Sequence, residues 1–405
     1  MNTVDIAESQ ALAPSNKTIP SSVAIEAGSR ASGPDILRSL AILLVMMVHL
    51  PIEATPGALM GVRSYGWIGV DIFFVLSGYL IGTQLLGEVK RYGRVDLKSF
   101  YLRRAFRILP AFFVVLGIYT FFPILRDAPT MQSAWRFATF TVNFGLDPRY
   151  GGTFTEAWSL SVEEHFYLVL PVLVLFLLKR VTLVSVLALA ASLLMVGAVL
   201  RFTIWQSEVG VYTDVQEYRQ AFASYLREIY YPTYNRLDGL MCGVLLAAAR
   251  LFRPDLWKRY VPARIALGVG AILVVAALLA FSYRGAFAGT DLPLVAQSLM
   301  GSVVGFPLLS AGVALILSGM LDLDPVLGRW RLPGAVAVAT LSYSLYLTHK
   351  GVYHLDNMVF GKENLLGLSG FVIYFATCFI VAATLWFLVE RTSLRLRDHF
   401  VPRSR

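Results

Sequence analysis

The sequence carries ionisable side chains inside long apolar segments, and these residues are the ones whose chemistry needs an explanation. In the first segment, PDILRSLAILLVMMVHLP, Arg38 and His49 lie eleven residues apart. On an α-helix this spacing is about three turns, so the two side chains share nearly one face, about 16 Å apart along the axis. A charge at that depth in a membrane costs at least about 2.5 kcal/mol and usually serves function. The alternative is that Arg38 snorkels to one membrane surface and His49 lies among the headgroups of the other.

Two further apolar segments carry carboxylates. Asp71, in GWIGVDIFFVLSGYLIG, needs a partner; we expect it either to orient His49 or, as the favoured alternative, to form a structural ion pair between helices. In TEAWSLSVEEHFYLVLP, Glu163 and Glu164 are adjacent, which in a membrane helix requires protonation, pairing or a wet cavity. Glu163 is therefore predicted to take part in proton transfer. The alternative, an interfacial helix start with a capping carboxylate, suits Glu156.

A cluster of guanidinium groups begins the third apolar segment. In KSFYLRRAFRILPAFF, Arg103, Arg104 and Arg107 fall close together, and Arg104 and Arg107, three residues apart, share a helical face. Because the guanidinium fork matches phosphate oxygens, the cluster is predicted to bind phosphate. The alternative is that these charges fix membrane topology and contact lipid headgroups.

The elements that must position these residues are membrane helices. The chain has 405 residues, of which 57% are hydrophobic and 15% charged, a composition that excludes a disordered chain and disfavours a soluble enzyme. Apolar segments long enough to cross a bilayer recur along it. We predict an all-α, polytopic integral membrane protein with about ten transmembrane helices, at residues 34–52, 67–87, 105–123, 158–178, 181–203, 237–252, 262–283, 295–319, 334–352 and 367–390.

The distribution of charge predicts the orientation. With a cytoplasmic N-terminus, 23 of the 35 Lys and Arg residues fall on the cytoplasmic side, so both termini are predicted to be cytoplasmic. This asymmetry explains the net charge of +9 without a nucleic-acid partner. We expect a disordered cytoplasmic tail at residues 1–33, the membrane domain at 34–392 and a basic cytoplasmic tail at 393–405. Cys242 and Cys378 are isolated, and no metal site is predicted.

Five motifs, in this order along residues 34–395, resemble the membrane acyltransferase 3 family: Arg38 with His49, GVDIFFVLSGYLI, RRAFRILP, WSLSVEEHFYLVLP, and LSYSLYLTH ending at His349. The resemblance implies an acyltransferase of the bacterial inner membrane that moves an acyl group, usually acetyl, from cytoplasmic acyl-CoA to a hydroxyl of a glycan or glycolipid. It implies no tightly bound cofactor, because acetyl-CoA is the donor substrate. Unlike some members, the chain is expected to lack a fused extracytoplasmic hydrolase-like domain.

By this resemblance Arg38 and His49 are the essential pair of the first helix. His49 is expected to act as general base or as transient acyl carrier, and Arg38 to bind CoA phosphate or stabilise charge near the thioester. Glu163 is expected to tune or shuttle protons, and the arginine cluster to bind CoA. The complete prediction is catalytic residues His49, Arg38 and Glu163, cofactor-binding residues Arg103, Arg104 and Arg107, and supporting or substrate-binding residues Asp71, Glu164, Trp158, Ser159, Arg236, Asp238 and His349, with no metal ligand.

Other functions and partners remain open from the sequence. A transporter or flippase for a lipid-linked glycan would also need many spans and intramembrane charges, as would a membrane scaffold; dependence on CoA separates these from an acyltransferase. Six tyrosines between residues 203 and 236 are interpreted as an aromatic belt at the membrane edge, with sugar stacking as the alternative. The expected partners are membrane lipids, acyl-CoA and a glycan or glycolipid, whose identity the sequence leaves open along with the oligomeric state.

Overall fold

The structure is a computed structural model that describes residues 32–176, 182–212, 214–283, 298–330 and 334–401. Every regular element in these ranges is helical. The prediction of an all-α fold is therefore confirmed. The predicted tail at residues 1–33 lies outside the described residues except for its last two positions.

Each of the predicted apolar segments contains one long helix. These helices are α1 (Ser32–His49), α3 (Ile68–Tyr92), α4 (Leu97–Phe121), α6 (Ala157–Phe176), α7 (Leu183–Ile204), α9 (Asp238–Phe252), α11 (Ala263–Ser282), α12 (Phe306–Asp322), α14 (Ala335–Phe360) and α15 (Gly367–Leu385). Shorter helices connect or extend them: α2 (Met60–Ser64), α5 (Ala134–Ala138), α8 (Tyr218–Tyr225), α10 (Pro254–Tyr260), α13 (Asp324–Trp330) and α16 (Arg391–Phe400).

Single helical turns complete the described chain. The 3₁₀ turns are Ile52–Ala54, Gly57–Leu59, Pro123–Leu125, Val215–Glu217, Thr233–Asn235 and Lys362–Asn364. The π-helical turns are Trp205–Val209, Leu226–Tyr230, Gly301–Gly305 and Trp386–Glu390. The last of these joins α15 to α16, so the predicted C-terminal tail begins as a continuation of the last helix.

Eight of the described helices are long and apolar enough to cross a membrane. The predicted segments at α9 and α14 fall outside that set for different reasons. Helix α9 has 15 residues, fewer than the ~20 that a bilayer core requires. Helix α14 has 26 residues, but polar side chains, among them His349 and Lys350, interrupt its apolar sequence. Both are shielded by other helices, α9 by α3, α7 and α12, and α14 by α1 and α15. The chain is thus a polytopic integral membrane protein with eight candidate spans among the described helices, and the predicted spans at α9 and α14 are not among them.

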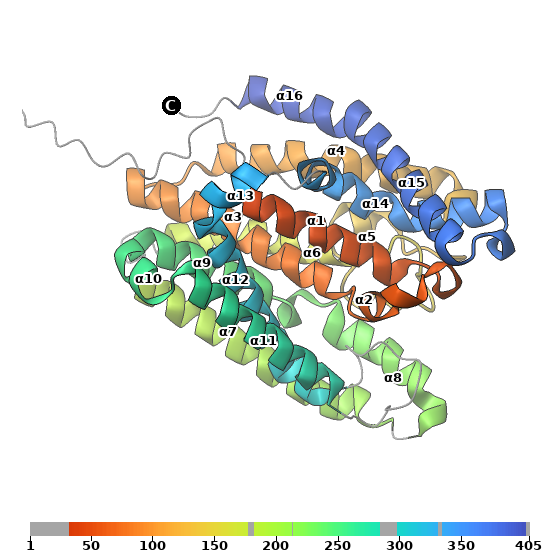
Figure 1. The fold of residues 1–405 in the computed structure, drawn as a ribbon, viewed down its shortest axis with the longest axis horizontal. Coiled ribbons are helices and arrows are strands. Elements are labelled where there is room, and N and C mark those ends of the chain that lie inside the picture. The colour runs from red at the N-terminus through yellow and green to blue at the C-terminus, as the bar shows by residue number, and fades with distance from the viewer. Residues whose placement is uncertain (1–31, 177–181, 213, 284–297, 331–333, 402–405) are drawn as a thin grey trace, which may run out of the picture.

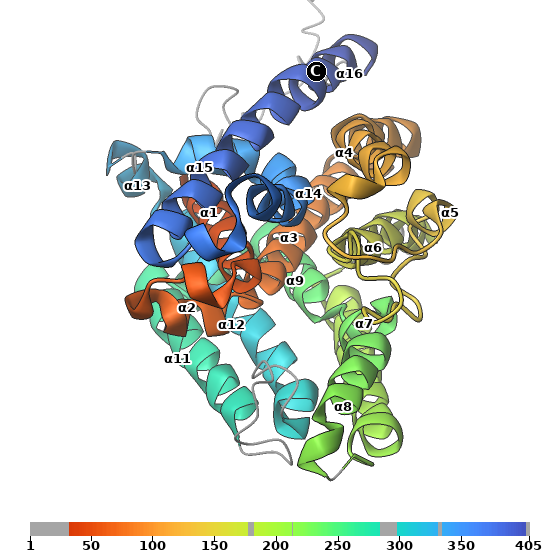
Figure 2. The ribbon, with the colours of Figure 1, turned by 90° about the vertical axis from the view of Figure 1, so that its right-hand side faces the viewer.

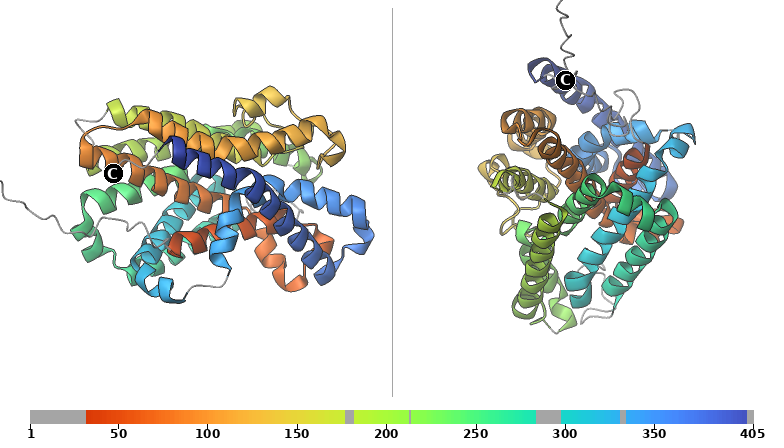
Figure 3. Two further views of the ribbon diagram at one scale, coloured as in Figure 1. Left: turned by 90° about the horizontal axis from the view of Figure 1, so that it is seen from above. Right: turned by 90° about the vertical axis from the view of Figure 1, so that its left-hand side faces the viewer.

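The helices are arranged around α1 and α3. Seen from one end, these two lie at the centre, with α4 and α6 on one side, α11 and α12 below, and α14 and α15 above (Figure 2). The opposite end shows the same arrangement in the right panel of Figure 3. Along the long axis, α10 lies toward one end and α2 and α8 toward the other (Figure 1).

Small residues bring α3 and α9 into close contact. A Cβ atom on Gly78 would lie 2.0 Å from the carbonyl oxygen of Leu240, and one on Gly243 would lie 2.3 Å from that of Val75. Glycine at both positions lets the two backbones approach, as is common between membrane helices. On α3, the neighbouring residue Ser77 faces α6, where it donates a hydrogen bond to Glu163.

Candidate active site

A cavity of about 110 Å³ lies among α1, α3, α4, α6 and α14. Five of the predicted residues line it together: Arg38 of α1, Arg104 and Arg107 of α4, and Ser159 and Glu163 of α6. The remaining walls are mostly apolar and aromatic, with polar groups from three helices. They are formed by Val70, Phe73, Phe74, Ser77, Leu80, Ile108, Leu160, Tyr167, Ser342, Tyr343 and Tyr346. We call this feature the arginine cavity.

The start of α4 places two of the arginines. Asp96 caps the helix, since its carboxylate accepts hydrogen bonds from the hydroxyl and the main-chain N–H of Ser99, which hold the pKa of that carboxyl below its usual range. Arg104 and Arg107 follow one turn apart on the same face. At the far wall, the Tyr343 hydroxyl donates to the Ile108 carbonyl at 2.8 Å, which ties α14 to α4 beside the cavity.

Glu163 lies within the cavity wall, and both of its carboxylate oxygens accept hydrogen bonds. Ser77 donates to Oε1 at 3.1 Å and Tyr167 donates to Oε2 at 2.6 Å. The guanidinium of Arg104 lies 5.0 Å from the centre of the Tyr167 ring, a cation–π distance. Glu163 therefore holds the hydroxyls of Ser77 and Tyr167 in place. The ring of Tyr167 is also the one that lies against the Arg104 guanidinium.

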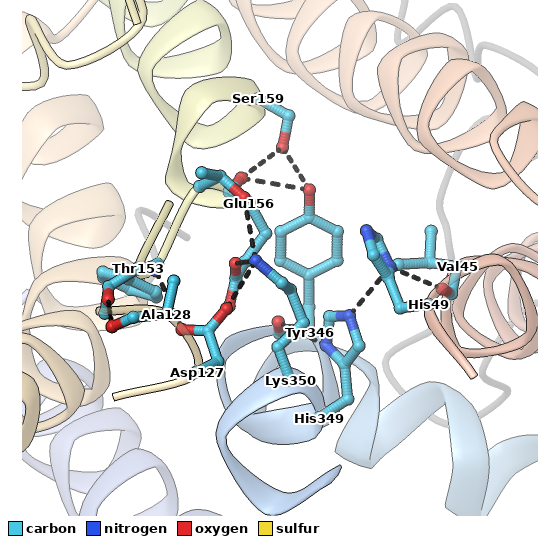
Figure 4. A network of polar contacts seen from close by, with 12 residues as sticks. Val45, His49, Asp127, Ala128, Thr153, Glu156, Ser159, Tyr346, His349 and Lys350 are labelled. Atoms are coloured by element: carbon cyan, nitrogen blue, oxygen red, sulfur yellow. Dashed lines mark hydrogen bonds and ion pairs between the residues drawn. The ribbon is translucent and has the colours of Figure 1, made fainter. Parts of the chain in front are cut away.

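His49 lies at the opposite end of α1 from Arg38 and meets His349 of α14. His349 Nε2 and His49 Nδ1 are 3.2 Å apart, and the ring centres are 5.0 Å apart (Figure 4). The His349 side chain is fully buried, whereas His49 is exposed. We call these two residues the histidine pair. Neither of them lines the arginine cavity.

The main chain determines which nitrogens of the histidine pair carry hydrogen. His349 Nδ1 lies 2.9 Å from the Tyr346 carbonyl and 3.1 Å from that of Leu345; because a carbonyl only accepts, Nδ1 donates and neutral His349 accepts at Nε2. His49 Nδ1 lies between that Nε2 and the Val45 carbonyl at 2.9 Å, so it also carries hydrogen. The neutral imidazole of His49 then has its lone pair on Nε2, where a general base or a nucleophile needs it.

Tyr346 belongs to both regions. Its ring lines the arginine cavity, and its carbonyl accepts the His349 hydrogen bond. Its hydroxyl shares a 2.6 Å hydrogen bond with Ser159 and donates to the Glu156 carbonyl at 3.2 Å (Figure 4). Tyr346 therefore separates the cavity from the histidine pair while connecting the two through its own atoms.

The predicted role of Asp71 in orienting His49 is wrong. Asp71 instead forms a buried ion pair of 2.9 Å with Arg236, whose guanidinium is surrounded by aromatic rings, including that of Phe306 at 3.9 Å. Asp238 pairs with Arg201 at 2.7 Å, and this pair is also buried. Arg236 and Asp238 lie outside the cavity lining. This geometry agrees with the favoured alternative, a structural ion pair for Asp71. The Arg236 guanidinium already compensates the Asp71 charge, so the carboxylate is not directed at a histidine.

The other predicted supporting residues divide between cavity and core. Ser159 lines the cavity, whereas Trp158 is buried against Phe74 and does not. Arg103 and Glu164 lie beside the site on α4 and α6 but outside the lining. The interpretation of the tyrosines as an aromatic belt is wrong for Tyr225, Tyr230 and Tyr231, which are buried in the core.

Four residues that the sequence analysis did not select lie around the histidine pair: Tyr346, Lys350, Asp127 and Glu156. Lys350 forms ion pairs with Asp127 at 2.7 Å and Glu156 at 3.3 Å. The capping role considered for Glu156 is wrong, because its carboxylate faces Lys350. The signal in the sequence was Lys350 itself, an ammonium inside an apolar segment that requires a counter-ion.

The described residues contain no group of three or more His, Cys, Asp or Glu placed to hold a metal ion. Cys242 and Cys378 are buried free thiols. The chemistry of the region is therefore best read from its guanidinium, carboxylate, hydroxyl and imidazole groups.

Known proteins with similar sequences match parts of the chain, and one of them matches most of it. The peptidoglycan O-acetyltransferase OatA of Listeria monocytogenes is 27% identical over 343 residues, which cover 80% of this chain and 50% of that protein. The O-acetyltransferase OatA of Staphylococcus aureus is 33% identical over 165 residues, covering 36% of this chain and 25% of that protein. The chain thus spans half or less of the length of these relatives. No solved structure matches it.

A family model described as an acyltransferase domain matches residues 32–388, which include every residue of the arginine cavity and the histidine pair. The match agrees with the order of motifs along the sequence and with the helical membrane fold. The chain belongs to the acyltransferase 3 family of membrane proteins.

Proposed function

We propose that the chain is a membrane O-acyltransferase that moves an acyl group, acetyl in the first instance, from cytoplasmic acyl-CoA to a hydroxyl of a cell-surface or secreted glycan or glycolipid. The observation that carries this proposal is the pairing of two regions through Tyr346. The arginine cavity offers three guanidinium groups to a polyanion, and the histidine pair offers a neutral imidazole with a free lone pair. An acyl-CoA substrate needs both groups, since it has a phosphorylated tail and a reactive thioester.

The arginine cavity is assigned to donor binding. Arg104 and Arg107 would hold phosphate oxygens of CoA through charge-assisted hydrogen bonds. Arg38, which also contacts Asp35 at 3.6 Å, would bind a further phosphate or stabilise charge that develops on the thioester oxygen. The apolar walls formed by Phe73, Leu160 and their neighbours suit the uncharged arm that links the nucleotide to the thioester.

The histidine pair is assigned to the chemical step. In a direct transfer, Nε2 of His49 accepts the proton of the acceptor hydroxyl while the hydroxyl oxygen attacks the thioester carbonyl carbon. The carbon–sulfur bond breaks, and the thiolate of CoA takes up the proton. His349 stays hydrogen-bonded to His49 Nδ1 and stabilises the imidazolium formed during the step.

A two-step transfer uses the same atoms in a different order. His49 Nε2 attacks the thioester carbon, releases the CoA thiolate and carries the acyl group as an acyl-imidazole. The acceptor hydroxyl then attacks that carbon, its proton leaves to solvent or to the thiolate, and His49 returns to its neutral form. Glu163, which holds the Ser77 and Tyr167 hydroxyls, supports the donor side in either route.

The positive-inside pattern supports an orientation in which the arginine cavity opens to the cytoplasm, where CoA is found, and His49 lies toward the outer surface of a bacterial inner membrane. The printed names of the relatives, which are O-acetyltransferases, support acetyl as the group transferred. A transporter or flippase for a lipid-linked glycan is the second candidate; it would not require the histidine geometry described above.

The proposal is tested with the purified chain in lipid nanodiscs. Acetyl-CoA is supplied with and without a glycan acceptor, and free thiol release is followed together with the mass of the acceptor. We expect thiol release that depends on the acceptor, and an acceptor mass increased by about 42 Da, the increment that acetylation of a hydroxyl adds. Movement of a labelled glycan across vesicles without CoA, and no acceptor modification, would instead support the transporter.

A further inference from the structure

A cluster of three charges, one buried and two half-buried, lies beside the histidine pair. The Nζ atom of Lys350 forms ion pairs with Asp127 at 2.7 Å and with Glu156 at 3.3 Å. The side chains are 17%, 7% and 1% exposed, respectively. Nζ also donates to the Thr155 hydroxyl at 2.8 Å. Removing charges from water is unfavourable unless they compensate one another, so a cluster that persists here calls for a role.

Glu156 holds α14 at two points. Its carboxylate pairs with Lys350, and its main-chain carbonyl accepts the hydrogen bond from the Tyr346 hydroxyl. Tyr346 and Lys350 lie four residues apart on α14, one on each side of His349 in the sequence. Figure 4 shows Lys350 and His349 diverging from α14, one on each side of the Tyr346 ring. The segment that carries His349 is thus attached to the start of α6 by two contacts of Glu156, and hydrogen bonds to Thr155 and Ser159 reinforce the attachment.

Asp127 attaches the same cluster to the loop that precedes α6. Its Oδ1 accepts a hydrogen bond from the main-chain N–H of Phe154 at 3.2 Å, and the Thr153 hydroxyl donates to the Ala128 carbonyl at 2.9 Å. Phe154 has a φ of 57°, a left-handed conformation that is unusual for an aromatic residue and that these contacts hold. Loop, α6 and α14 therefore converge on Lys350.

We propose that Glu156 and Lys350 are positioning residues that set the orientation of His349 and, through it, the hydrogen bond to His49 Nδ1. This inference rests on the proposed function of the histidine pair. Neither residue contacts His49 directly through a hydrogen bond that the structure records; each acts on α14, whose Tyr346 carbonyl receives the His349 Nδ1–H. Loss of the ion pair would release one side of the helix segment, and a displacement of the imidazole would follow.

The test uses the full chain in nanodiscs with Glu156→Gln, Lys350→Met and Lys350→Arg. The matched control is Asp322→Asn, which also changes a carboxylate to an amide in an ion pair, here with Arg250 between α9 and α12 at 2.8 Å. We expect Glu156→Gln and Lys350→Met to lower kcat by about 10- to 100-fold with little change in KM for acetyl-CoA, because misplacing a catalytic group affects the chemical step. Lys350→Arg keeps the charge and should retain more activity than Lys350→Met, and Asp322→Asn should keep the wild-type kcat.

A second measurement reads the position of His349 without activity. Diethyl pyrocarbonate acylates accessible neutral imidazoles, and mass spectrometry locates the products. His349 is fully buried, so it should stay unlabelled in the wild-type and Asp322→Asn proteins. It should become labelled in folded Glu156→Gln and Lys350→Met proteins.

Unchanged kcat together with unlabelled His349 in Glu156→Gln would overturn the inference. Equal losses of kcat in Lys350→Arg and Lys350→Met would also contradict it, because the ion pair would not matter. If the wild-type chain transfers no acyl group, the proposed function fails, and the labelling of His349 still decides whether Glu156 and Lys350 position it. If Lys350→Met does not fold, Glu156→Gln and Lys350→Arg carry the test.

Discussion

The arginine cavity and the histidine pair occupy opposite ends of α1 and differ in how their side chains are held. In the cavity, the guanidinium of Arg38 lies beside the Asp35 carboxylate, and that of Arg104 lies over the Tyr167 ring. In the histidine pair, two imidazoles are oriented by main-chain carbonyls. Fixed charge suits the binding of a polyanion, whereas a neutral nitrogen suits attack or proton transfer. On the proposed function, donor binding and chemistry are therefore separated along one helix.

Tyr346 is the residue that contacts both regions. Its ring lines the cavity, and its carbonyl holds His349. On the proposed function, Tyr346 thus contacts both the donor cavity and His349, the hydrogen-bond partner of His49. If the two regions are separate, changes in one should affect binding and changes in the other should affect turnover.

The largest effect is expected from His49→Ala. Because the lone pair on Nε2 is lost, acyl transfer should fall by about 10²- to 10⁴-fold, the range that general acid–base groups contribute. Transfer to a glycan acceptor is measured at matched amounts of folded protein. Wild-type rates in this variant would break the comparison, since the imidazole would then have no part in turnover.

The next largest effect is expected from the double change Arg104→Gln and Arg107→Gln. Loss of two charge-assisted contacts should raise KM for acetyl-CoA by about 10- to 100-fold. The effect on kcat should be smaller. Initial rates over a range of acetyl-CoA concentrations measure both constants; a loss confined to kcat would mean that the cavity is not the donor site.

A smaller effect is expected from Glu163→Gln. The amide keeps the shape of the side chain, but its nitrogen donates where one of the hydroxyls of Ser77 and Tyr167 also donates. One hydroxyl then loses its acceptor, and the rate should fall by about tenfold. Tyr167→Phe serves as the comparison, because it removes one of these bonds without changing the charge. A rate in Glu163→Gln equal to that of the wild type would remove Glu163 from the donor side.

Asp71→Asn should act on stability. The change leaves Arg236, which is 1% exposed, without an anionic partner. Breaking a buried ion pair in this way costs about 3–5 kcal/mol of folding free energy. Thermal unfolding in detergent, followed by the fraction of protein that stays monodisperse, measures the loss. A melting temperature unchanged from the wild type would show that the pair does not hold α3 to the chain preceding α9.

Much of the fold can be predicted from the sequence, because a helix that crosses a bilayer requires a long apolar segment that is visible in the sequence. Each predicted apolar segment overlaps a helix, and Gly78 lies where α3 and α9 approach closely. Helix α9 departs from the prediction in length and α14 in polarity, and both pack against other helices, which a window of sequence does not contain.

The site is less evident from the sequence than the fold. Arg38, Arg104, Arg107 and Glu163 are found by their charge in apolar segments, and the cavity brings them together. The partners of charges are a different matter: Asp71 meets Arg236, which is 165 positions away, and nothing in local spacing indicates this. Glu156 and Lys350 pair across a similar distance in the chain, so their relation to His349 appears only in three dimensions.

The most direct test of the separation is acetyl-CoA binding to the His49→Ala chain, measured by isothermal titration in nanodiscs beside its rate of acyl transfer. The Arg104→Gln and Arg107→Gln double variant is measured in parallel. We predict that His49→Ala binds acetyl-CoA with a wild-type Kd but transfers the acyl group at least about 100-fold more slowly, while the arginine variant binds acetyl-CoA weakly. Loss of binding in His49→Ala, or a wild-type Kd in the arginine variant, would contradict the account.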